Sequence, residues 1–583
     1  MFDLLGLSAL LAWPRRLQHS QLLLKVFDLP ELNDIILSHM SRSDQVRWAR
    51  VSKKWHHAAI PYIWNDLSGL SEPQIKRLAR IIADDYRRFG CHSSNVMNGK
   101  QSSLVKYGPL IRNLGKNLWL TGFNDEFCMS EVLGQDEREH VENNLMVLKI
   151  TRHFLMYCSR LKAVTVALPD VRFQGSIAKV IADMTAQQLQ HLSIAGRIHA
   201  QTLQYTLSRC STTLETLEIF LMLSMNGRRA PTIEIDEARQ GPLSSLKSLK
   251  LSSCESPFYD DALSPLWRRC ESVEELHLRG CNIQFLQLMP NIIETFLPNL
   301  NTITIVPDSD GLKLEDQDLA RLLSASRLGW KSIDIVGYMA FVNLSRKALF
   351  RHTSTLENFK MVNWHLWEGH ILRAILLSFP RLQTFVTLDD GVIDFSKIIS
   401  IDANTWIHQS PSTGSLTPWP CEYSLTDLRI KISGIPRPDV THDHHGGRRQ
   451  PVVSESYPGE GREIQHRVYE RLSRFVNLEV LWLGSNSCYY EVPSQPLKKV
   501  VDHQYECLEM SLESGLDQLE GLKRLKILNI NLMATRVGQK EAQWMAGQWP
   551  RLHEIRGLEN RGDARKARQW LKGNRPHIAS KKE

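Results

Sequence analysis

Hydrophobic positions in this chain follow two patterns, a short helical one and a long repetitive one. Between residues 30 and 60, apolar residues recur at helical spacing, as at Leu32, Ile35, Ile36 and Met40. From residue 161 onward, one apolar residue is followed three and five positions later by two more, in the manner of L-x-x-L-x-L. The first pattern predicts a small group of helices, and the second predicts short strands with one buried face.

Residues that begin and end helices punctuate the first pattern. Pro30 suits the first turn of one helix, because its missing N–H would have no partner there. Ser41 can cap a second helix, and Ser52 can cap a third that carries Trp55 and is expected to stop before Pro61. Three short helices bury too little apolar surface to be stable alone. We therefore expect them to pack against a partner or against the rest of the chain.

Regular spacing distinguishes the strand pattern from the chance matches expected in a chain with 42% hydrophobic residues. Successive copies that begin between Leu161 and Leu382 are separated by 28, 25, 32, 27, 27, 30, 26 and 26 residues. Helix-like stretches, such as 318–326 and 370–378, lie between them. A strand, a turn, a helix and a return at this period form the leucine-rich-repeat unit. The fold class predicted is therefore α/β, a solenoid with parallel strands on its concave face and helices outside.

Later copies begin at Leu425, Leu478, Leu525 and Leu552, and their spacing widens to 43, 53 and 47 before it returns to 27. The extra length lies in insertions near 388–424, 431–470 and 484–520 that are rich in Ser, Pro, Gly or His. Such composition cannot bury enough apolar surface to fold independently, so we expect mobile loops on the solenoid.

These patterns divide the chain into five parts. We predict an N-terminal extension (1–24), a small helical module (25–67), a helical linker with the first repeats (68–160), the solenoid with its insertions (161–558) and a basic tail (559–583). Within the linker, residues 81–90 are expected to be helical, and residues 118–120 are a candidate early strand.

The helical module resembles a known family. Leu29-Pro30-Glu31-Leu32, Ile35-Ile36, Val46, Ala49 and Val51-Ser52-Lys53-Lys54-Trp55 closely resemble the F-box, over residues 28–67. This resemblance implies a three-helix unit that binds a Skp-type adaptor, which in turn holds the cullin and RING subunits of a ubiquitin ligase. The implied adaptor-binding residues are Leu29, Pro30, Leu32, Ile35, Ile36, Met40, Val46, Val51 and Trp55, although Trp55 is expected mainly to hold the unit together. Cysteines before several strands, such as Cys158 and Cys270, also resemble the repeat variant of F-box proteins.

The repeat pattern also predicts which residues line the concave surface. Residues between and beside the core positions of each strand alternate outward. They include Glu218, Lys250, Glu275, His277, Thr304, Asp334, Lys360, Arg429, Trp482, Asn529 and Arg556. Most residues on such a surface only face water, yet solenoids usually bind protein partners along this strip. Trp482 is the most suggestive, since tryptophan is frequent at interface hot spots, unless the flanking insertions cover it.

Composition and charge narrow the classes of function. The 583 residues carry a net charge of +8, which is too weak over this length to imply nucleic-acid or membrane binding. No apolar run reaches the roughly 20 residues that span a bilayer. Ten cysteines without a CxxC pair indicate reduced thiols and a cytoplasmic or nuclear protein. Residues 1–13 are apolar but lack a basic flank and a cleavage site, so a packing helix or loose extension is predicted there, not a secretion signal.

No catalytic signature is present. His442, His444 and His445 could ligate a metal, but no Cys or carboxylate cluster completes a site, and a solvated loop explains them. Phosphate-binding glycine loops and the G-x-S-x-G elbow are absent from the sequence, so no cofactor and no metal is expected. After Asn560, eight Lys or Arg residues stand against two Asp or Glu, which we interpret as a solvated end.

Three hypotheses follow. The first is a non-catalytic substrate receptor of an SCF-type ubiquitin ligase, in which the F-box recruits the ligase core and the repeats capture an unknown target protein. The second is a leucine-rich-repeat scaffold without a ubiquitin role, whose helical module only caps the solenoid. The third is a hydrolase or metal enzyme hidden in the insertions, which the missing signatures disfavour.

Overall fold

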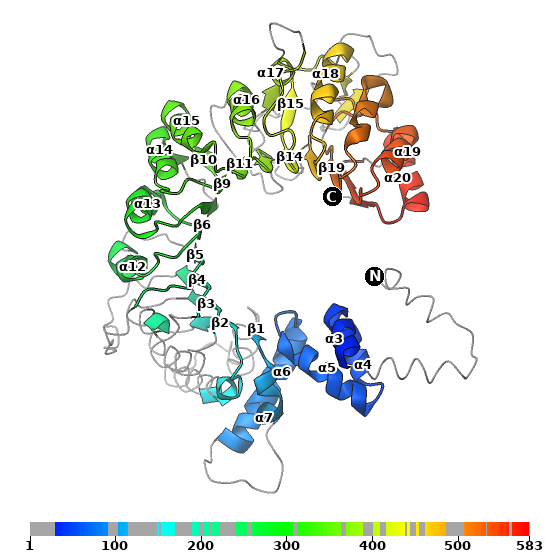
Figure 1. Cartoon of the computed structure of the whole chain (residues 1–583). Helices are drawn as coiled ribbons and strands as arrows, with labels where there is room; N and C mark the ends of the chain where they lie inside the picture. Colours follow the sequence, from blue (N-terminus) through cyan, green and yellow to red (C-terminus); the bar gives the residue numbers. More distant parts are fainter. Residues whose placement is uncertain are drawn as a thin grey trace, which may run out of the picture. The chain divides into compact units, whose positions relative to one another are not determined.

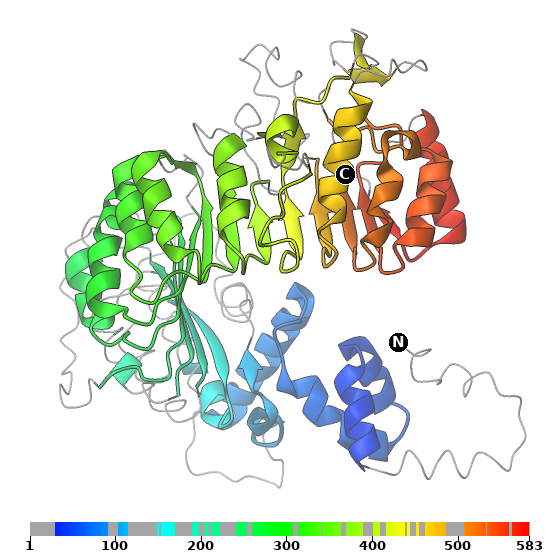
Figure 2. The same cartoon turned by 45° about the horizontal axis from the view of Figure 1, so that its top comes forward.

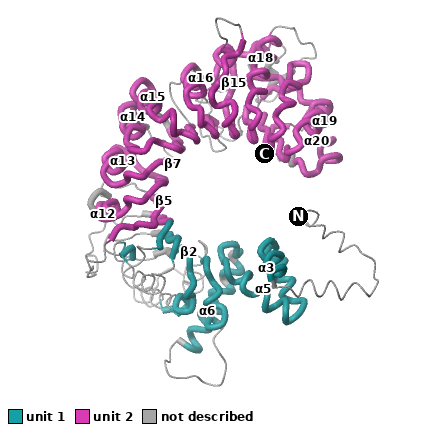
Figure 3. Tube along the Cα trace, in the orientation of Figure 1, with its two compact units in different colours: residues 1–215, 224–240 teal, residues 216–223, 241–583 magenta. Residues whose placement is uncertain are grey.

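The computed structural model divides into two compact units, which are described separately (Figure 3). Unit 1 holds residues 1–215 and 224–240, and unit 2 holds residues 216–223 and 241–583. The structure describes residues 30–90, 103–114, 149–150, 153–168, 189–196, 203, 206–208, 213–221, 241–252, 259–306, 313–339, 341–362, 369–388, 400–408, 415–437, 440–443, 450–453, 461–484, 507–531, 533–558 and 562–581.

The described part of unit 1 starts at the three predicted helices, α3 (Pro30–His39), α4 (Arg42–Ala49) and α5 (Lys53–Asn65). Ser41 Oγ accepts a hydrogen bond from the Asp44 amide at 3.2 Å, and Ser52 Oγ accepts one from the Trp55 amide at 3.2 Å. Both serines are therefore the predicted N-caps.

The prediction that the third helix stops before Pro61 is wrong, since α5 runs through Pro61 to Asn65. The end of the extended helix has partners elsewhere in the chain. Arg42 donates to the Ile63 and Asp66 carbonyls at 2.9 and 2.8 Å, and Trp64 stacks on Tyr107 with 4.9 Å between ring centroids. These contacts offset the one hydrogen bond that proline removes from the helix.

The linker then forms α6 (Glu72–Asp85), η2 (Tyr86–Gly90), α7 (Ser103–Tyr107) and η3 (Gly108–Leu110), so residues 81–90 are helical as predicted. A parallel sheet follows, made of β1 (Asn113–Leu114), β2 (Ala163–Leu168) and β3 (His191–Gly196). The sequence pattern missed β1, which is only two residues long. The candidate strand at 118–120 lies outside the described residues.

In unit 2, one strand follows each repeat start predicted from Leu214 to Leu552, and one more strand, β21, follows without a predicted start. They are β4 (Thr216–Leu221), β5 (Ser248–Ser252), β6 (Glu275–Arg279), β7 (Thr302–Val306), β9 (Ser332–Val336), β11 (Asn358–Val362), β12 (Thr384–Val386), β14 (Asp427–Arg429), β18 (Val480–Trp482), β19 (Ile527–Asn529), β20 (Glu554–Arg556) and β21 (Ala579–Lys581). Each strand pairs in parallel with the next. The carbonyl before each strand extends the ladder, as when Glu274 accepts from the Asn301 and Thr302 amides at 3.1 Å each.

Helices cover the outer side of unit 2 and its strands line the inner side (Figure 1). The helices, which stand side by side along the array in Figure 2, are α12 (Tyr259–Trp267), α13 (Ile283–Phe296), α14 (Asp316–Ser324), α15 (Asn343–Leu349), α16 (Gly369–Ser378), α18 (Arg462–Ser473), α19 (Gln539–Gln548) and α20 (Gly562–Asn574). Apolar strand positions such as Leu249, Leu276 and Ile303 are buried against them. The leucine-rich-repeat-like solenoid predicted from the spacing is therefore present in unit 2.

Smaller elements decorate the array. They are β8 (Lys313–Leu314) paired with β10 (Tyr338–Met339), β13 (Ser400–Asp402) paired with β15 (Lys431–Ser433), the antiparallel β16 (Val440–Asp443) and β17 (Gln450–Val453), α17 (Ala403–Trp406), η7 (Phe350–His352), η12 (Leu512–Ser514) and η13 (Leu516–Gly521).

The cysteines within the described residues are Cys158, Cys270, Cys281, Cys421 and Cys507, and all five are free and buried, as predicted. Burial raises the pKa of the Cys270 thiol to about 12. A thiol held this firmly in its protonated form acts as a small apolar side chain, not as a nucleophile.

Parts of the first two insertions pack onto the solenoid, against the expectation of loops. Trp406 and Trp419 are buried edge to face, 4.7 Å apart, and both lie near Phe475. Arg471 of α18, whose side chain is 0% exposed, holds this cluster through the Glu422 carboxylate at 3.0 Å. The tryptophans of the first insertion thereby bury apolar surface next to the end of α18.

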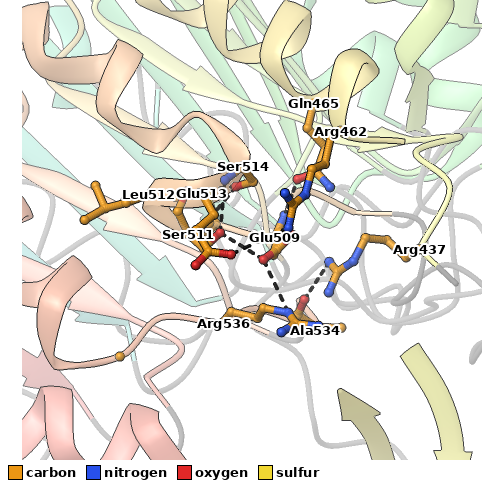
Figure 4. Close-up of polar contacts among 12 residues, drawn as sticks. Arg437, Arg462, Gln465, Glu509, Ser511, Leu512, Glu513, Ser514, Ala534 and Arg536 are labelled. Carbon is orange, nitrogen blue, oxygen red and sulfur yellow. Dashed lines mark hydrogen bonds and ion pairs between the residues drawn. The ribbon is translucent and has the colours of Figure 1, made fainter. Parts of the chain in front are cut away.

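The end of the third insertion is also packed (Figure 4). The Glu509 amide donates to Gln465 Oε1 at 3.0 Å, and the Glu509 carboxylate accepts from Ser511 Oγ at 2.9 Å. Arg536 Nε lies 3.3 Å from the same carboxylate, and Arg437 donates to the Ala534 carbonyl at 2.8 Å. Residues 507–515 therefore form a polar layer that joins α18 to the segment after β19.

The basic tail is not a solvated end. Residues 562–574 form α20 and residues 579–581 form β21, which pairs in parallel with β20. Ala567, Leu571 and Ile578 are buried. The sequence analysis considered only the charge of the segment and missed an apolar stripe at helical spacing. Because this stripe is buried, the tail forms one further repeat.

Candidate functional site

The first candidate surface lies on the helical module of unit 1. Ile35 is 55% exposed, Val46 36% and Val51 70%. These side chains stand at positions that the F-box pattern assigns to adaptor contact. Leu32, Ile36, Met40 and Trp55 are partly exposed, whereas Leu29 and the side chain of Pro30 lie outside the described residues. We call Leu32, Ile35, Ile36, Met40, Val46 and Val51 the module face.

A separate set of side chains holds the module together. Leu37 and Ala59 are completely buried, and Gln45 Nε2 donates to the Leu37 carbonyl at 2.8 Å. Trp48 and Trp55 meet edge to face at 4.3 Å between α4 and α5, as expected for a tryptophan that holds the unit together. Because the module has this interior, the most exposed residues of the module face are not needed to complete it.

The end of α5 joins the module to the first strand of unit 1. The Leu67 amide donates to the Asn113 carbonyl at 2.9 Å, and the Arg112 amide donates to the Asn65 carbonyl at 3.0 Å. Residues 65–67 thus extend the edge of the sheet beyond β1, and an isolated parallel bridge links Asp66 to Asn113. The contacts that cap the edge of the sheet therefore come from residues 65–67, at the end of α5. The most exposed apolar side chains instead come from α3, from α4 and from the turn after α4.

The second candidate surface is the inner face of the unit 2 sheet. The strand register places Glu218, Lys250, His277, Thr304, Asp334, Lys360, Val386, Arg429, Trp482, Asn529 and Arg556 in one row across β4 to β20. Glu275 lies two residues earlier, in the neighbouring row with Ser248, Asp427 and Glu554. All of the predicted concave residues therefore share two adjacent rows, which we call the inner rows.

Ion pairs neutralise much of the inner rows. Lys360 Nζ lies 3.5 Å from the Asp334 carboxylate. Arg429 contacts Asp427 at 2.8 Å, and Arg556 contacts Glu554 at 2.5 Å, in each case two residues back along the same strand. The sequence pattern did not select Asp427 and Glu554, although their period-two spacing from the arginines was a usable signal.

Trp482 does not offer an exposed aromatic surface. It is 3% exposed, and its ring lies between the guanidinium carbons of Arg429 at 4.1 Å and Arg556 at 4.9 Å. Asn529, its neighbour in the row, is completely buried. Cation–π contact explains why a tryptophan stands here, so the open part of the inner rows lies nearer β5 to β11.

His277 stands in that more open part. Burial and the positive charge of Lys250 lower the pKa of His277, while Glu275 and Asp334 act in the opposite direction. Its Nε2 lies 3.7 Å from the Glu275 carboxylate. The imidazole is therefore mainly neutral near pH 7 and gains its proton only in more acidic solution.

No group of three His, Cys, Asp or Glu side chains among the described residues could hold a metal ion. His442 belongs to β16, while His444 and His445 lie outside the described residues. No helix in the described part of the chain is long and apolar enough to cross a membrane.

Comparison with known proteins gave no family assignment: no family model matches the chain, and no curated protein matches it. One similar solved structure, of the Rad7 and Elc1 complex in yeast, has 11% identity and a TM-score of 0.35 over 94% of each chain. An internalin (inlF) from Listeria monocytogenes has 14% identity and a TM-score of 0.30, over 75% of this chain and 87% of its own. Overlap this low carries no functional argument, so the repeat architecture rests on the chain's own strands and helices.

Proposed function

We propose that this chain is the substrate receptor of a ubiquitin ligase, with the module face docking on a Skp-type adaptor and the inner rows holding a target protein. The observation that carries the proposal is the exposure of Ile35, Val46 and Val51 at the positions that the F-box pattern reserves for the adaptor. In this role the chain supplies proximity and orientation, and other subunits transfer ubiquitin.

Energetics support a partner on the module face. Fully burying a Val or Ile side chain stabilises by about 1.5–3 kcal/mol, so several such residues left in water are costly for one small module. The exposed residues Ile35, Val46 and Val51 are not part of the module interior, which contains the buried Leu37 and Ala59. A partner with an apolar groove would recover that free energy on binding.

The join between α5 and β1 supports the receptor role in a second way. Hydrogen bonds from Leu67 and Arg112 make the end of α5 continuous with the sheet edge in unit 1. A docked adaptor would therefore be held by a short, hydrogen-bonded connection to the first repeats, not by a loose linker.

The direct test is co-purification with a Skp-type adaptor. An Ile35→Asp/Val51→Asp variant of the full chain should lose adaptor binding by at least about tenfold, because charge is placed in an apolar contact. Leu328→Asp is the matched control, since Leu328 is an exposed apolar residue of unit 2, between α14 and β9. If the intact chain fails to retain the adaptor, the proposal is wrong.

A second candidate is a repeat scaffold without a ubiquitin role, favoured by the capping contacts of residues 65–67. The same variant separates the two functions. A pure cap predicts that Ile35→Asp/Val51→Asp binds every partner as the wild type does, because neither residue contributes to the cap.

A further inference from the structure

On the inner face of the unit 2 sheet, several carboxylates form ion pairs, whereas two cations of adjacent strands have no carboxylate partner among the described residues. Asp334 is engaged by Lys360 and Asp427 by Arg429, while the Glu275 carboxylate lies 3.7 Å from His277, which is mainly neutral near pH 7. Within the described residues, no carboxylate pairs with Lys250 of β5 or with Arg279 of β6. Lys250 is partly exposed and Arg279 is exposed, so both can meet a partner.

Strand register places these cations together. Lys250 is the lateral neighbour of His277, and Arg279 follows two residues later on the same face of β6. Neighbouring strands lie about 4.8 Å apart and alternate residues about 7 Å apart, which long Lys and Arg side chains can span. Lys250, His277 and Arg279 therefore form one basic corner of the sheet.

A buried hydroxyl lies at the edge of the same corner. Ser248 precedes Lys250 by two residues on β5, is 8% exposed, and its Oγ has no hydrogen-bond partner among the described residues. A buried hydroxyl without a partner costs about 1–3 kcal/mol, which a hydrogen bond to a bound group would offset.

We propose that Ser248, Lys250, His277 and Arg279 form a subsite that binds an anionic side chain in an acidic segment of the target protein. This inference rests on the proposed function and names the chemistry of the partner. A protein segment fits better than a free ion because the inner rows continue on both sides of the corner, and an extended peptide has the period of a strand.

The neighbouring carboxylates set the selectivity of the subsite. Glu218 is the lateral neighbour of Lys250 on β4, and Glu275 lies in register with Ser248 and contacts His277. Asp334 lies two strands away from His277 in the row and is engaged by Lys360. The bound anionic side chain is therefore expected on the Arg279 side of Lys250, away from Glu218 and Glu275, while the Ser248 hydroxyl, beside Glu275, would donate to a neighbouring group of the bound segment. Glu275, Asp334 and Lys250 face His277, and a bound anion would favour its protonated form.

The test uses arrays of synthetic ten-residue peptides probed with the full-length chain. Their central residue is glutamate, phosphoserine, alanine or lysine within otherwise neutral sequences. The wild type should retain the anionic peptides at least about tenfold better than the lysine peptides. The glutamate and phosphoserine arms distinguish a carboxylate from a phosphate.

A Lys250→Glu/Arg279→Glu variant should lose this preference, whereas Lys347→Glu, on the outer helix α15, should keep it. Retention on the glutamate peptide should also rise from pH 7.5 to pH 6, and His277→Gln should remove that rise. The proposal is overturned if the wild type shows no preference for anionic peptides, or if the double variant keeps it while folding normally by circular dichroism. Neither result bears on adaptor binding, which is measured separately through the module face.

Discussion

The helical module of unit 1 differs from the α18 cluster of unit 2, which consists of Trp406, Trp419, Glu422, Arg471 and Phe475. The module exposes apolar side chains, whereas the α18 cluster buries a charged one. The module leaves Ile35 and Val51 in water, although its interior is complete. The α18 cluster buries the Arg471 guanidinium fully and supplies it with Glu422 and the Trp419 ring. A region that gives its buried charge an internal partner is built for stability, whereas one that leaves apolar side chains exposed is built for a partner.

The largest effect is expected from Arg471→Ala. This change leaves the Glu422 carboxylate buried without its partner and removes donors to the Thr417 and His408 carbonyls. Loss of one member of a buried ion pair costs about 3–5 kcal/mol. Arg467→Ala on the same helix removes a more exposed pair with Glu463 and should cost only about 0.5 kcal/mol. Urea unfolding midpoints of both variants measure the contrast, and equal losses would contradict it.

In the helical module, one substitution should affect stability and another should affect adaptor binding. Leu37→Ala empties a fully buried site and should destabilise the module by about 2–5 kcal/mol. Ile35→Ala removes exposed atoms and should change stability by no more than about 0.5 kcal/mol, yet weaken adaptor binding. Hydrogen exchange of the α3 amides reports the first effect and adaptor titration the second. A large loss of protection in Ile35→Ala would mean that Ile35 belongs to the interior.

A smaller effect is expected at Asp316, whose carboxylate accepts hydrogen bonds from backbone amides of the next repeat. Its carboxylate accepts from the Val342, Leu344 and Ser345 amides at 2.9, 2.9 and 3.0 Å at the start of α15. Burial acts to raise the pKa of Asp316, but hydrogen bonds from Ser345, Leu344 and Val342 outweigh it and lower the pKa. Asp316→Asn should cost about 1 kcal/mol at pH 7.

The lowered pKa of Asp316 also fixes the direction of a pH effect. Because the folded chain holds this carboxyl ionised more firmly than the unfolded chain does, its contribution is complete above the unfolded pKa, about 4. That contribution is lost as the pH falls through the lower, folded value. Unfolding curves at several pH values should therefore converge for the wild type and Asp316→Asn in acid, and a constant difference would contradict the assignment.

Much of the architecture could be predicted from local pattern. Repeat starts from Leu161 to Leu552 each led to a strand, because alternation of buried and outward residues is a property of a few consecutive positions. The caps Ser41 and Ser52 were predictable for the same reason. Period two also placed Lys250, His277 and Arg429 on one inner row before any contact was known.

Features that depend on distant residues escaped the sequence pattern. Trp482 was expected to face outward and does belong to an inner row, but Arg429 and Arg556, from other strands, enclose it. Pro61 was expected to end a helix, yet Arg42 and Tyr107 support the helix beyond it.

The sequence alone therefore determined where the strands of the predicted repeats lie and which way their side chains alternate. Only the tertiary structure decided which outward residues stay accessible, because burial depends on neighbours brought together from repeats far apart in the chain. Ser248 and Arg279 show the difference: the sequence pattern selected neither of them. The burial of Ser248, and the lack of a carboxylate partner for Arg279 among the described residues, became visible only in the folded sheet.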